Sequence, residues 1–496
     1  MTDTSLTSLA TATRGALIGG QDADIRGGRV MIDSRLIKPG DLFWALRGEH
    51  HDGHDFLAEA RQRGASAAVV RFDRLDQAHT VWQSGSERGL VPPLIVVEDT
   101  LTALAEFAHW HRPKHEALVI GVTGSFGKTT TREMIHAVLS ASHPGIRSLK
   151  NFNNHIGLPL SVLELNSTHD FAVFEMGASA LDEIALLAEI ARPDIGVITG
   201  IGLAHVEGFG SREGIICGKG ELLEALPLSG FAIVPGDDPV TRAMASRARC
   251  PVLFVGESEL NHVRATNVRL ANQRLTFEVE HIEYTVPVSG RHFLTAALTA
   301  LTIANEIGLS PSNIARGFAN FQAAPGRCQV HHIGPWIVID DTYNANPASM
   351  RAACATLRDW QGVNKRLLIT GDMLELGTYS EQAHIELGRA AAEVGVDGLL
   401  VIGEQAERVI QGALAGGLRP SRLAQCDDLE ILLAALDCVL ESGDVLLVKG
   451  SRGMRMERVV EWLRDKAEGL GVRDQGLVTN NTSPLASSSQ SLIPNP

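Results

Sequence analysis

A glycine-rich turn between an apolar run and a helical stretch constrains this sequence more than any other feature. Residues 117–122 (ALVIGV) form a continuous apolar run of the kind that is buried in parallel sheets. The run leads into TGSFGKTT at 123–130, and a helix is predicted from about Lys128 to Ser140. Glycines let such a loop curl so that its N–H groups face phosphate oxygens, and the helix start adds positive potential. The pattern therefore predicts a phosphate site on an α/β fold.

The loop supplies side chains suited to a nucleotide triphosphate and its magnesium ion. Lys128 can reach the β- and γ-phosphates, and the Thr129 hydroxyl can ligate Mg²⁺. The spacing is T-G-x-x-G-K-T, because Val122 stands where the common form has its first glycine. An incidental glycine-rich turn is the alternative, and the flanking strand and helix patterns argue against it. The nucleotide-binding residues predicted in the loop are Thr123, Gly124, Ser125, Phe126, Gly127, Lys128, Thr129 and Thr130.

Length and repeated strand–turn–helix patterns predict an α/β protein of three domains. The 496 residues correspond to about three domains of average size. We predict a small N-terminal α/β domain over 1–113, a central doubly wound parallel sheet over 114–324 and a C-terminal Rossmann-like sheet over 325–471. The remaining residues, 472–496, contain few side chains that can pack and are predicted to be a disordered tail.

Apolar runs mark the strands that we expect in each sheet. In the N-terminal domain they are DLFWAL, ASAAVV and PLIVVED, and in the central domain they are 117–122, 171–176, 194–200 and 231–235. The C-terminal sheet should contain 336–340, 366–371, 398–403 and 444–450. The alternating pattern over 261–289 predicts an antiparallel excursion. The charged stretch HRPKHE at 111–116 is predicted to be a linker.

Charge and composition exclude several classes of protein. The chain has 44 Lys and Arg against 58 Asp and Glu, and a net charge of −14 argues against bulk binding to nucleic acid. No apolar run reaches the roughly 18 to 20 residues of a membrane span, and the N-terminus lacks a secretory signal pattern. The six scattered cysteines are expected to be reduced thiols, without a structural zinc site. We therefore predict a cytoplasmic protein with no nucleic-acid partner and no membrane insertion.

Polar residues follow two further strands of the predicted central sheet. Glu175 ends the run 171–176, where α/β sheets bind ligands, so it could share a metal with Thr129. A carboxylate that caps the next helix is the alternative. His205 follows the run 194–200 and could reach the same edge, although a lone histidine is more often structural. Lys219 lies in a predicted helix and would ordinarily be solvated.

The C-terminal domain opens with a dense polar loop. Asp340 to Pro347 reads DDTYNANP after a predicted strand, which is more polar than a helix cap requires, although capping is the alternative. Arg327 precedes the first predicted strand of this domain and could reach a phosphate across an interdomain cleft. Lys449, Ser451 and Arg452 follow the last predicted strand and form a candidate site for a carboxylate.

Taken together, these motifs resemble the Mur ligases, which are ATP-dependent amide-forming enzymes of peptidoglycan precursor synthesis. The resemblance covers about residues 30–465, in strings such as TGSFGKTTTREM, NFNNHIGLPLSVL, AHVEGFGS, PGRCQV, DDTYNANPASM, GDMLELG and LVKGSRGMRME. The loop DDTYNANP is the most discriminating. It is similar to the branch of the family that adds D-alanyl-D-alanine to UDP-N-acetylmuramoyl-tripeptide, and the DNPR motif of the diaminopimelate-adding branch is missing from the sequence.

The resemblance implies a division of labour and a reaction. An N-terminal domain would bind the UDP-sugar, a central domain would hold ATP with Mg²⁺, and a C-terminal domain would close over both. ATP would phosphorylate the carboxylate of the tripeptide, the amine of D-alanyl-D-alanine would attack the acyl phosphate, and phosphate would leave. We expect a monomer with these substrates.

The same resemblance implies roles for individual residues. The expected catalytic residues are Lys128, Lys219, His205 and Glu175. The expected metal ligands are Thr129, Glu175, His205 and Lys219, of which Lys219 matches a lysine that is carbamylated in the family. Outside the glycine-rich loop, the expected nucleotide contacts are Arg327, Asp341 and Asn344. The expected substrate-binding residues are Ser34, Arg35, Asn151, Asn154, His155, Lys449, Ser451 and Arg452.

The sequence departs from the family pattern at two positions where asparagine is common. Phe293 and Ala296 replace these asparagines, the first of which contacts the adenine side in the family. Phe293 could instead stack on the base. Two alternatives therefore stay open beside the D-alanyl-D-alanine ligase. One is a related ligase with a different amino-acid donor, and the other is a nucleotide-binding homologue without catalysis.

Overall fold

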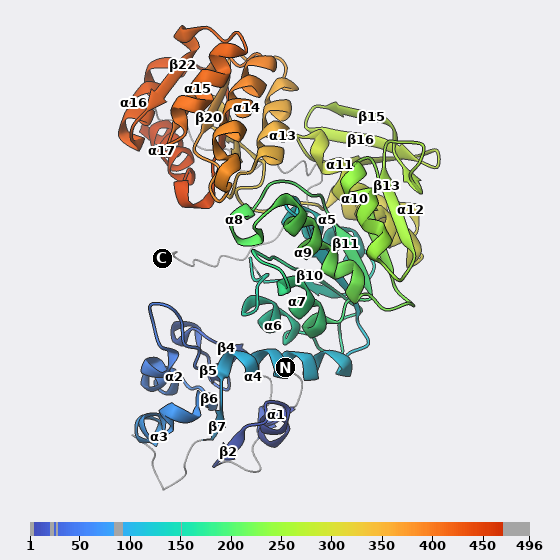
Figure 1. Ribbon diagram of the computed structural model, residues 1–496, viewed down its shortest axis with the longest axis vertical. Coiled ribbons are helices and arrows are strands. Elements are labelled where there is room, and N and C mark those ends of the chain that lie inside the picture. The colour runs from blue at the N-terminus through green and yellow to red at the C-terminus, as the bar shows by residue number, and fades with distance from the viewer. Residues whose placement is uncertain (1–3, 20–23, 26–27, 84–92, 150, 470–496) are drawn as a thin grey trace, which may run out of the picture.

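A computed structural model of the chain describes residues 4–19, 24–25, 28–83, 93–149 and 151–469. These residues form three α/β bodies along the long axis of the molecule, with the N-terminal body at one end and the C-terminal body at the other (Figure 1). The fold class is therefore the predicted one. The domain bounds given above stay predictions, and the predicted tail at 472–496 lies outside the described residues.

The N-terminal body is built around a five-stranded sheet. Its strand order is β2 (Ala16–Ile18), β7 (Leu94–Val97), β6 (Ala67–Arg71), β5 (Leu42–Trp44) and β4 (Val30–Met31), and only the β2–β7 pair is antiparallel. The three predicted apolar runs are confirmed as β5, β6 and β7. A short pair, β1 (Thr4–Ser5) and β3 (Asp24–Ile25), is separate. The helices are α1 (Leu6–Ala12), α2 (Leu57–Gln62), α3 (Leu75–Gln83) and α4 (Thr100–His111).

The central body contains a seven-stranded sheet in which every pair is parallel. The order is β14 (Val263–Arg264), β13 (Val252–Gly256), β12 (Phe231–Pro235), β11 (Ile195–Ile198), β8 (Leu118–Thr123), β10 (Phe171–Glu175) and β9 (Gly145–Arg147). The four predicted strands are confirmed as β8, β10, β11 and β12. They occupy the centre of the sheet, where burial on both faces requires continuous apolar runs.

Helices cover the sheet of the central body, and the predicted antiparallel excursion forms a separate three-stranded sheet. The excursion is confirmed as β15 (Thr266–Ala271), β16 (Arg274–Val279) and β17 (Ile282–Val286). The helix predicted after the glycine-rich loop is confirmed as α5 (Lys128–Leu139). The other helices are α6 (Gly157–Val162), α7 (Glu183–Ala191), α8 (Val206–Phe209), α9 (Arg212–Ala225), α10 (Pro239–Met244), α11 (Leu294–Glu306) and α12 (Pro311–Ala319).

The C-terminal body has a six-stranded sheet. The order is β18 (Gln329–Ile333), β19 (Trp336–Asp341), β23 (Val445–Lys449), β20 (Arg366–Thr370), β21 (Gly398–Ile402) and β22 (Leu423–Cys426). The four predicted strands are confirmed, and only the edge strand β18 is antiparallel to its neighbour. The helices are α13 (Pro347–Arg358), α14 (Ser380–Glu393), α15 (Ala406–Ala415), α16 (Leu429–Val439) and α17 (Glu457–Gly469).

The stretch predicted to be a linker at 111–116 is only partly packed into the molecule, since His111, Arg112 and His115 are buried whereas the other three residues are exposed. Arg112 is only 7% exposed. Its guanidinium donates to the carbonyl oxygens of His115 (2.8 Å) and Ala191 (3.0 Å) and pairs with Asp194 at 3.2 Å. The charge of Arg112 is therefore paired with a carboxylate of the central body, and backbone oxygens satisfy further guanidinium N–H groups.

Two further observations bear on the composition argument. None of the helices in the described residues is both long and apolar enough to cross a bilayer. All six cysteines are free thiols, as predicted, and four of them are buried.

Candidate active site

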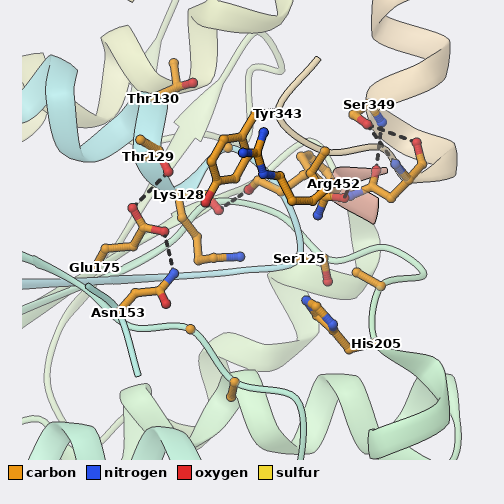
Figure 2. Close-up of a pocket in the computed structure, with 18 of the residues that line it drawn as sticks. Ser125, Lys128, Thr129, Thr130, Asn153, Glu175, His205, Tyr343, Ser349 and Arg452 are labelled. Carbon is orange, nitrogen blue, oxygen red and sulfur yellow. Dashed lines mark hydrogen bonds between the residues drawn. The ribbon is translucent and has the colours of Figure 1, made fainter. Parts of the chain in front are cut away.

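The predicted phosphate loop opens on a large cavity. This cavity has a volume of about 990 Å³ and is lined by all three bodies: by α4, by the loop after β8, and by the loops after β19 and β23. Figure 2 shows the side chains that converge on it. A site at the carboxyl ends of parallel strands is where open α/β sheets bind their ligands.

Two glycines allow the loop to take its shape. Gly124 has φ +149°, and a Cβ there would lie 2.2 Å from the Thr199 Oγ1 atom. Gly127 has φ +77° and is the N-cap of α5, whose first backbone N–H groups have no partner within the helix. Ser125 to Thr130 line the cavity. The hydroxyl of Ser125 is buried without a hydrogen-bond partner among the described residues, so it is available to a ligand oxygen.

The predicted loop residue Thr123 lies behind the cavity wall and supports the loop. Its hydroxyl donates to the Met176 carbonyl oxygen at 2.8 Å. Lys128 folds over the loop, and its Nζ donates to the Gly124 carbonyl oxygen at 2.7 Å. Desolvation lowers the pKa of Lys128, while the nearby Glu175 carboxylate opposes this shift. A phosphate would add the strong negative charge that this lysine lacks here.

Glu175 meets Thr129 as the sequence suggested. The Thr129 hydroxyl donates to Glu175 Oε2 at 2.9 Å, and Glu175 is 2% exposed at the end of β10 (Figure 2). The parallel pairing of β10 with β8 brings the two strand ends together. Two partners of Glu175 were not predicted: Asn153 Nδ2 donates to Oε1 at 2.9 Å, and Arg132 Nη1 lies 3.2 Å from Oε2.

The asparagine loop before α6 contributes differently from the prediction. Asn154 and His155 line the cavity, and Asn154 Oδ1 also accepts from the Gly157 N–H at 2.9 Å, at the start of α6. Asn151 is not among the lining residues, and Asn153 is. The motif NFNN therefore reaches the cavity, while the residue that contacts Glu175 is Asn153, two positions after the predicted Asn151.

The Thr129–Glu175 pair has the chemistry of a magnesium site. Among the described residues no three His, Cys, Asp or Glu side chains cluster as a complete metal site. Mg²⁺ is usually held by one or two carboxylates together with substrate phosphates and water, rather than by a full protein cage. A hydroxyl and a carboxylate 2.9 Å apart beside a phosphate loop fit that pattern.

His205 and Lys219 do not join this pair directly. His205 lines the cavity, and its Nδ1 contacts the carboxylate of Glu375 from the C-terminal body. Burial lowers the pKa of His205, and Glu375 opposes the shift. Lys219 on α9 lies beneath the cavity wall at 1% exposure, and its Nζ donates to the Ala178 carbonyl oxygen at 2.9 Å. Burial, and then the charge of Lys128, hold the pKa of Lys219 well below its usual range.

The C-terminal body supplies the opposite wall. Arg327 Nη2 donates to the Thr129 hydroxyl at 3.0 Å, and the Arg327 guanidinium lies 3.9 Å above the Tyr343 ring. Arg452 lies 5.9 Å from the centre of the same ring, so Tyr343 contacts two cations. Arg327 and Arg452 were predicted, and Tyr343 is an addition.

The other predicted residues of this wall are held by hydrogen bonds within the C-terminal body. Lys449 Nζ donates to Asp341 Oδ2 at 2.6 Å and to the Asn344 carbonyl oxygen at 2.8 Å. Ser451 accepts from the Leu374 N–H at 2.8 Å. All four of these residues line the cavity, and the hydrogen bonds give this wall a fixed shape.

The predicted residues of the N-terminal body lie apart from the cavity wall. Ser34 donates its hydroxyl to Glu59 at 2.7 Å, and Arg35 pairs with Asp33 at 2.8 Å. Neither residue lines the cavity. Their role in binding a UDP-sugar stays a prediction.

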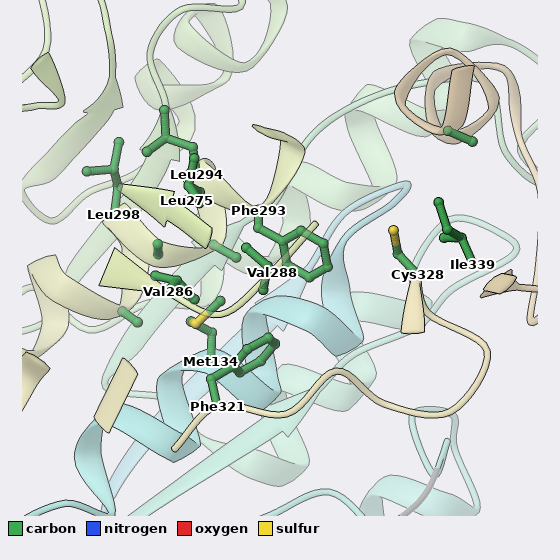
Figure 3. Close-up of a cluster of buried hydrophobic side chains, with 14 of the residues drawn as sticks. Met134, Leu275, Val286, Val288, Phe293, Leu294, Leu298, Phe321, Cys328 and Ile339 are labelled. Atoms are coloured by element: carbon green, nitrogen blue, oxygen red, sulfur yellow. The ribbon is translucent and has the colours of Figure 1, made fainter. Parts of the chain in front are cut away.

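Phe293 lies in the hydrophobic core at the border of the cavity. Its ring is 1% exposed and packs edge-on against Phe321, with centroids 6.1 Å apart (Figure 3). Its face is therefore not free for the base stacking considered above. Phe293 and Ala296 are among the residues that line the cavity, as is His292.

Comparison with known proteins agrees with this geometry. Three family models match successive parts of the chain: Mur ligase family, catalytic domain (29–112), Mur ligase middle domain (122–304) and Mur ligase, glutamate ligase domain (326–452). The UDP-N-acetylmuramoyl-tripeptide–D-alanyl-D-alanine ligase of Escherichia coli K12 is 34% identical over 94% of this chain and 99% of its own length. The chain belongs to the Mur ligase family.

Further Mur ligases are similar over most of their length. The protein of the same name from Bacillus subtilis 168 is 35% identical over 87% of this chain and 92% of its own. A crystal structure of MurF from Acinetobacter baumannii has a TM-score of 0.82 at 31% identity, covering 94% of this chain and 99% of that one. MurF ligase from Thermotoga maritima in complex with ADP has a TM-score of 0.76 at 29% identity, covering 90% and 100%.

Proposed function

We propose that this Mur ligase joins D-alanyl-D-alanine to UDP-N-acetylmuramoyl-tripeptide at the expense of ATP, in peptidoglycan precursor synthesis in the cytoplasm. The observation that carries the proposal is the contact network around Thr129. A phosphate loop, a carboxylate and an arginine from the opposite body meet at one hydroxyl, with Glu175 at 2.9 Å and Arg327 at 3.0 Å. Its relatives of similar length carry the same activity in their names.

In this proposal the triphosphate lies along the loop 123–130. The backbone N–H groups at the start of α5 and the Ser125 hydroxyl would bind phosphate oxygens. Lys128 would leave the Gly124 carbonyl oxygen for the β- and γ-phosphates, because a phosphate is the stronger acceptor. Thr129 and Glu175 would hold Mg²⁺, which when bound neutralises the charge that develops on the γ-phosphate.

The reaction has two group-transfer steps. A carboxylate oxygen of the tripeptide attacks the γ-phosphorus, the bond to the β-phosphate oxygen breaks, and an acyl phosphate and ADP result. The amine of D-alanyl-D-alanine then attacks the acyl carbon, phosphate leaves with the C–O bond electrons, and the amine loses a proton. Arg327 and Arg452 face this region and would orient the anionic groups, which makes catalysis largely a matter of positioning.

Lys219 would act in this proposal as a carbamate rather than as an ammonium. Its amine would add to CO₂, forming an N–C bond and releasing one proton, and the product carries a carboxylate-like group. This addition requires a neutral amine, and burial keeps the pKa of Lys219 low enough to provide one. Together with His205, the carbamate would complete a second position for Mg²⁺.

The decisive experiment is a donor panel. Purified full-length protein is incubated with ATP, Mg²⁺, UDP-N-acetylmuramoyl-tripeptide and either D-alanyl-D-alanine, D-alanine, L-alanine or D-glutamate, and ADP release and product mass are measured. We expect ADP and product with the dipeptide only. Product with a single amino acid instead would favour a ligase with another donor, and ADP release that no donor stimulates would favour a homologue without ligase activity.

The Lys128→Met variant tests the ATP site. It removes the cation of the phosphate loop but leaves a side chain of similar length. We expect ADP release to fall on the order of 10²- to 10³-fold, as for loss of one preorganised group that stabilises transition-state charge. Unchanged circular dichroism would show that the variant is folded, and an unchanged rate would contradict the assignment of Lys128.

A further inference from the structure

One loop of the C-terminal body reaches across to the central body and contacts His205. The loop joins β20 to the short turn Gly377–Tyr379 and contains Glu375. The carboxylate of Glu375 contacts His205 Nδ1, and the Glu375 carbonyl oxygen accepts from the Val206 N–H at 3.1 Å. α8, which follows His205, lies on the side of the central body next to the C-terminal body (Figure 1).

The loop that carries Glu375 is held firmly within its own body. The Met373 N–H donates to His384 Nε2 at 2.9 Å, and the Leu374 N–H donates to the Ser451 hydroxyl at 2.8 Å. Asp372 at its base accepts from the Glu404 N–H at 2.7 Å. The backbone that carries Glu375 is therefore held by the C-terminal body.

Both residues at this contact have an uncommon backbone. Glu375 has φ +62° and His205 has φ +55°, in the left-handed region that residues other than glycine seldom adopt. Such conformations cost about 1 kcal/mol or more each and persist where the surrounding contacts determine them. The paired bonds from Glu375 to His205 and Val206 are contacts of this kind.

We propose that Glu375 is a positioning residue that prepares His205 to bind Mg²⁺ at the second position, the one it would share with the Lys219 carbamate. A carboxylate that accepts from Nδ1–H fixes the tautomer and the orientation of the ring, and it leaves Nε2 as the nitrogen for a metal. Because Glu375 belongs to the C-terminal body, His205 is prepared only when that body lies against the central one. This inference rests on the metal site of the proposed function. It adds Glu375, a residue to which the sequence analysis assigns no role.

The test measures metal binding rather than turnover. Full-length protein with a nonhydrolysable ATP analogue is titrated with Mn²⁺, and free Mn²⁺ is followed by electron paramagnetic resonance. We expect Glu375→Gln to weaken Mn²⁺ binding about 10- to 100-fold, the usual effect of losing a group that orients a metal ligand. Glu381→Gln is the matched control, because Glu381 is on the same body and pairs with Arg408 at 3.4 Å, away from His205.

A double-variant cycle separates positioning from a general effect on folding. If Glu375 acts through His205, Glu375→Gln should weaken Mn²⁺ binding much less in a His205→Asn background than in the wild type. Equal losses in both backgrounds, or unchanged binding in the single variant, would overturn the proposal. Glu375→Asp keeps the charge on a shorter arm and should give an intermediate loss, which serves if Glu375→Gln does not fold.

The outcome is distinguishable from failure of the proposed function. A wild-type protein that binds Mn²⁺ with the nucleotide analogue but joins no dipeptide would remove the ligase assignment and leave the role of Glu375 intact. Wild-type protein that binds no Mn²⁺ with the analogue would overturn the role of Glu375. If the wild type joins the dipeptide and the Glu375→Gln variant binds Mn²⁺ normally, the ligase assignment stands and the role of Glu375 is overturned.

Discussion

Two buried lysines beside the cavity have opposite surroundings. Lys219 on α9 is 1% exposed, and Lys449 at the end of β23 is 2% exposed. Lys449 pairs with Asp341 at 2.6 Å, because the two residues are register partners on neighbouring parallel strands. Among the described residues Lys219 forms no ion pair: its Nζ donates to the Ala178 carbonyl oxygen and lies 4.9 Å above the Phe209 ring.

The difference lies in whether the buried amine has a carboxylate partner. A buried ammonium with a carboxylate partner keeps its charge and fastens two strands together. A buried ammonium without one pays the desolvation cost alone, so its neutral form is favoured and its pKa falls, as at Lys219. A neutral amine is a nucleophile, which is what carbamylation requires.

The largest effect should come from removing Lys219, the lysine without a carboxylate partner. We expect Lys219→Met to lower ligation on the order of 10²- to 10³-fold, because a group that helps to hold the charge-stabilising metal is lost. The rate is measured as ADP release with both substrates, and a carbamate signal after addition of ¹³C-labelled bicarbonate should be present in the wild type only. Turnover close to the wild-type value would show that Lys219 is merely a buried lysine.

The second effect should appear in stability, at the other lysine. Lys449→Met leaves Asp341 largely buried, with 17% of its side chain exposed, and without its cation. We expect the free energy of unfolding in urea to fall by about 3 kcal/mol. Adding Asp341→Asn should restore part of this loss, since the unpaired charge is then gone. A single variant as stable as the wild type would contradict the structural role of the pair.

The smallest effect should be a gain in stability rather than a loss, on replacing Lys219. In buffer free of CO₂, Lys219→Met should be as stable as the wild type or more stable by up to about 1 kcal/mol, because an unpaired buried amine is replaced by an apolar chain. The folded-state pKa of Lys219 lies below the ordinary value of 10.5. Between these two values the unfolded chain binds a proton that the folded chain lacks, so wild-type stability should rise with pH up to about 10.5.

Urea titrations at several pH values measure this difference. The variant has no amine at position 219, so the stability difference between the two proteins should shrink as pH rises toward about 10.5. Lys449→Met offers the contrast, since its loss of stability comes from the unpaired carboxylate. A stability difference at position 219 that does not change with pH would show that the Lys219 amine titrates normally.

The sequence predicted the centre of each sheet better than its edges. The runs at 117–122 and 336–340 are continuous and apolar, because strands buried on both faces need such side chains, and both formed strands. β9 and β14 have only three and two residues, too few for a pattern to be recognised. The burial of Arg112 within the predicted linker could not be read from the sequence, because one of the carbonyl oxygens that satisfy it belongs to Ala191, far along the chain.

The same distinction holds at the site. The phosphate loop was predicted because strand, loop and helix start are contiguous and the glycine requirement is local. Glu175 was predicted from its position at a strand end. Arg132 and Glu375 were missed, although Glu375 lies within GDMLELG, because their roles arise from contacts 43 and 170 residues away in sequence. No local pattern states which distant side chain a residue will meet.

Because all three bodies line the cavity, the concentration of a ligand should affect how stably the three bodies are assembled. Leu101 and Ala105 of α4, the loop at 125–130 and Arg452 lie on walls from three different bodies. A ligand that fills this space binds only when all three are assembled, so mass action favours assembly. At a concentration about 100 times its dissociation constant, such a ligand adds about 2.7 kcal/mol to the assembled state. Amide hydrogen exchange should then slow in all three bodies together.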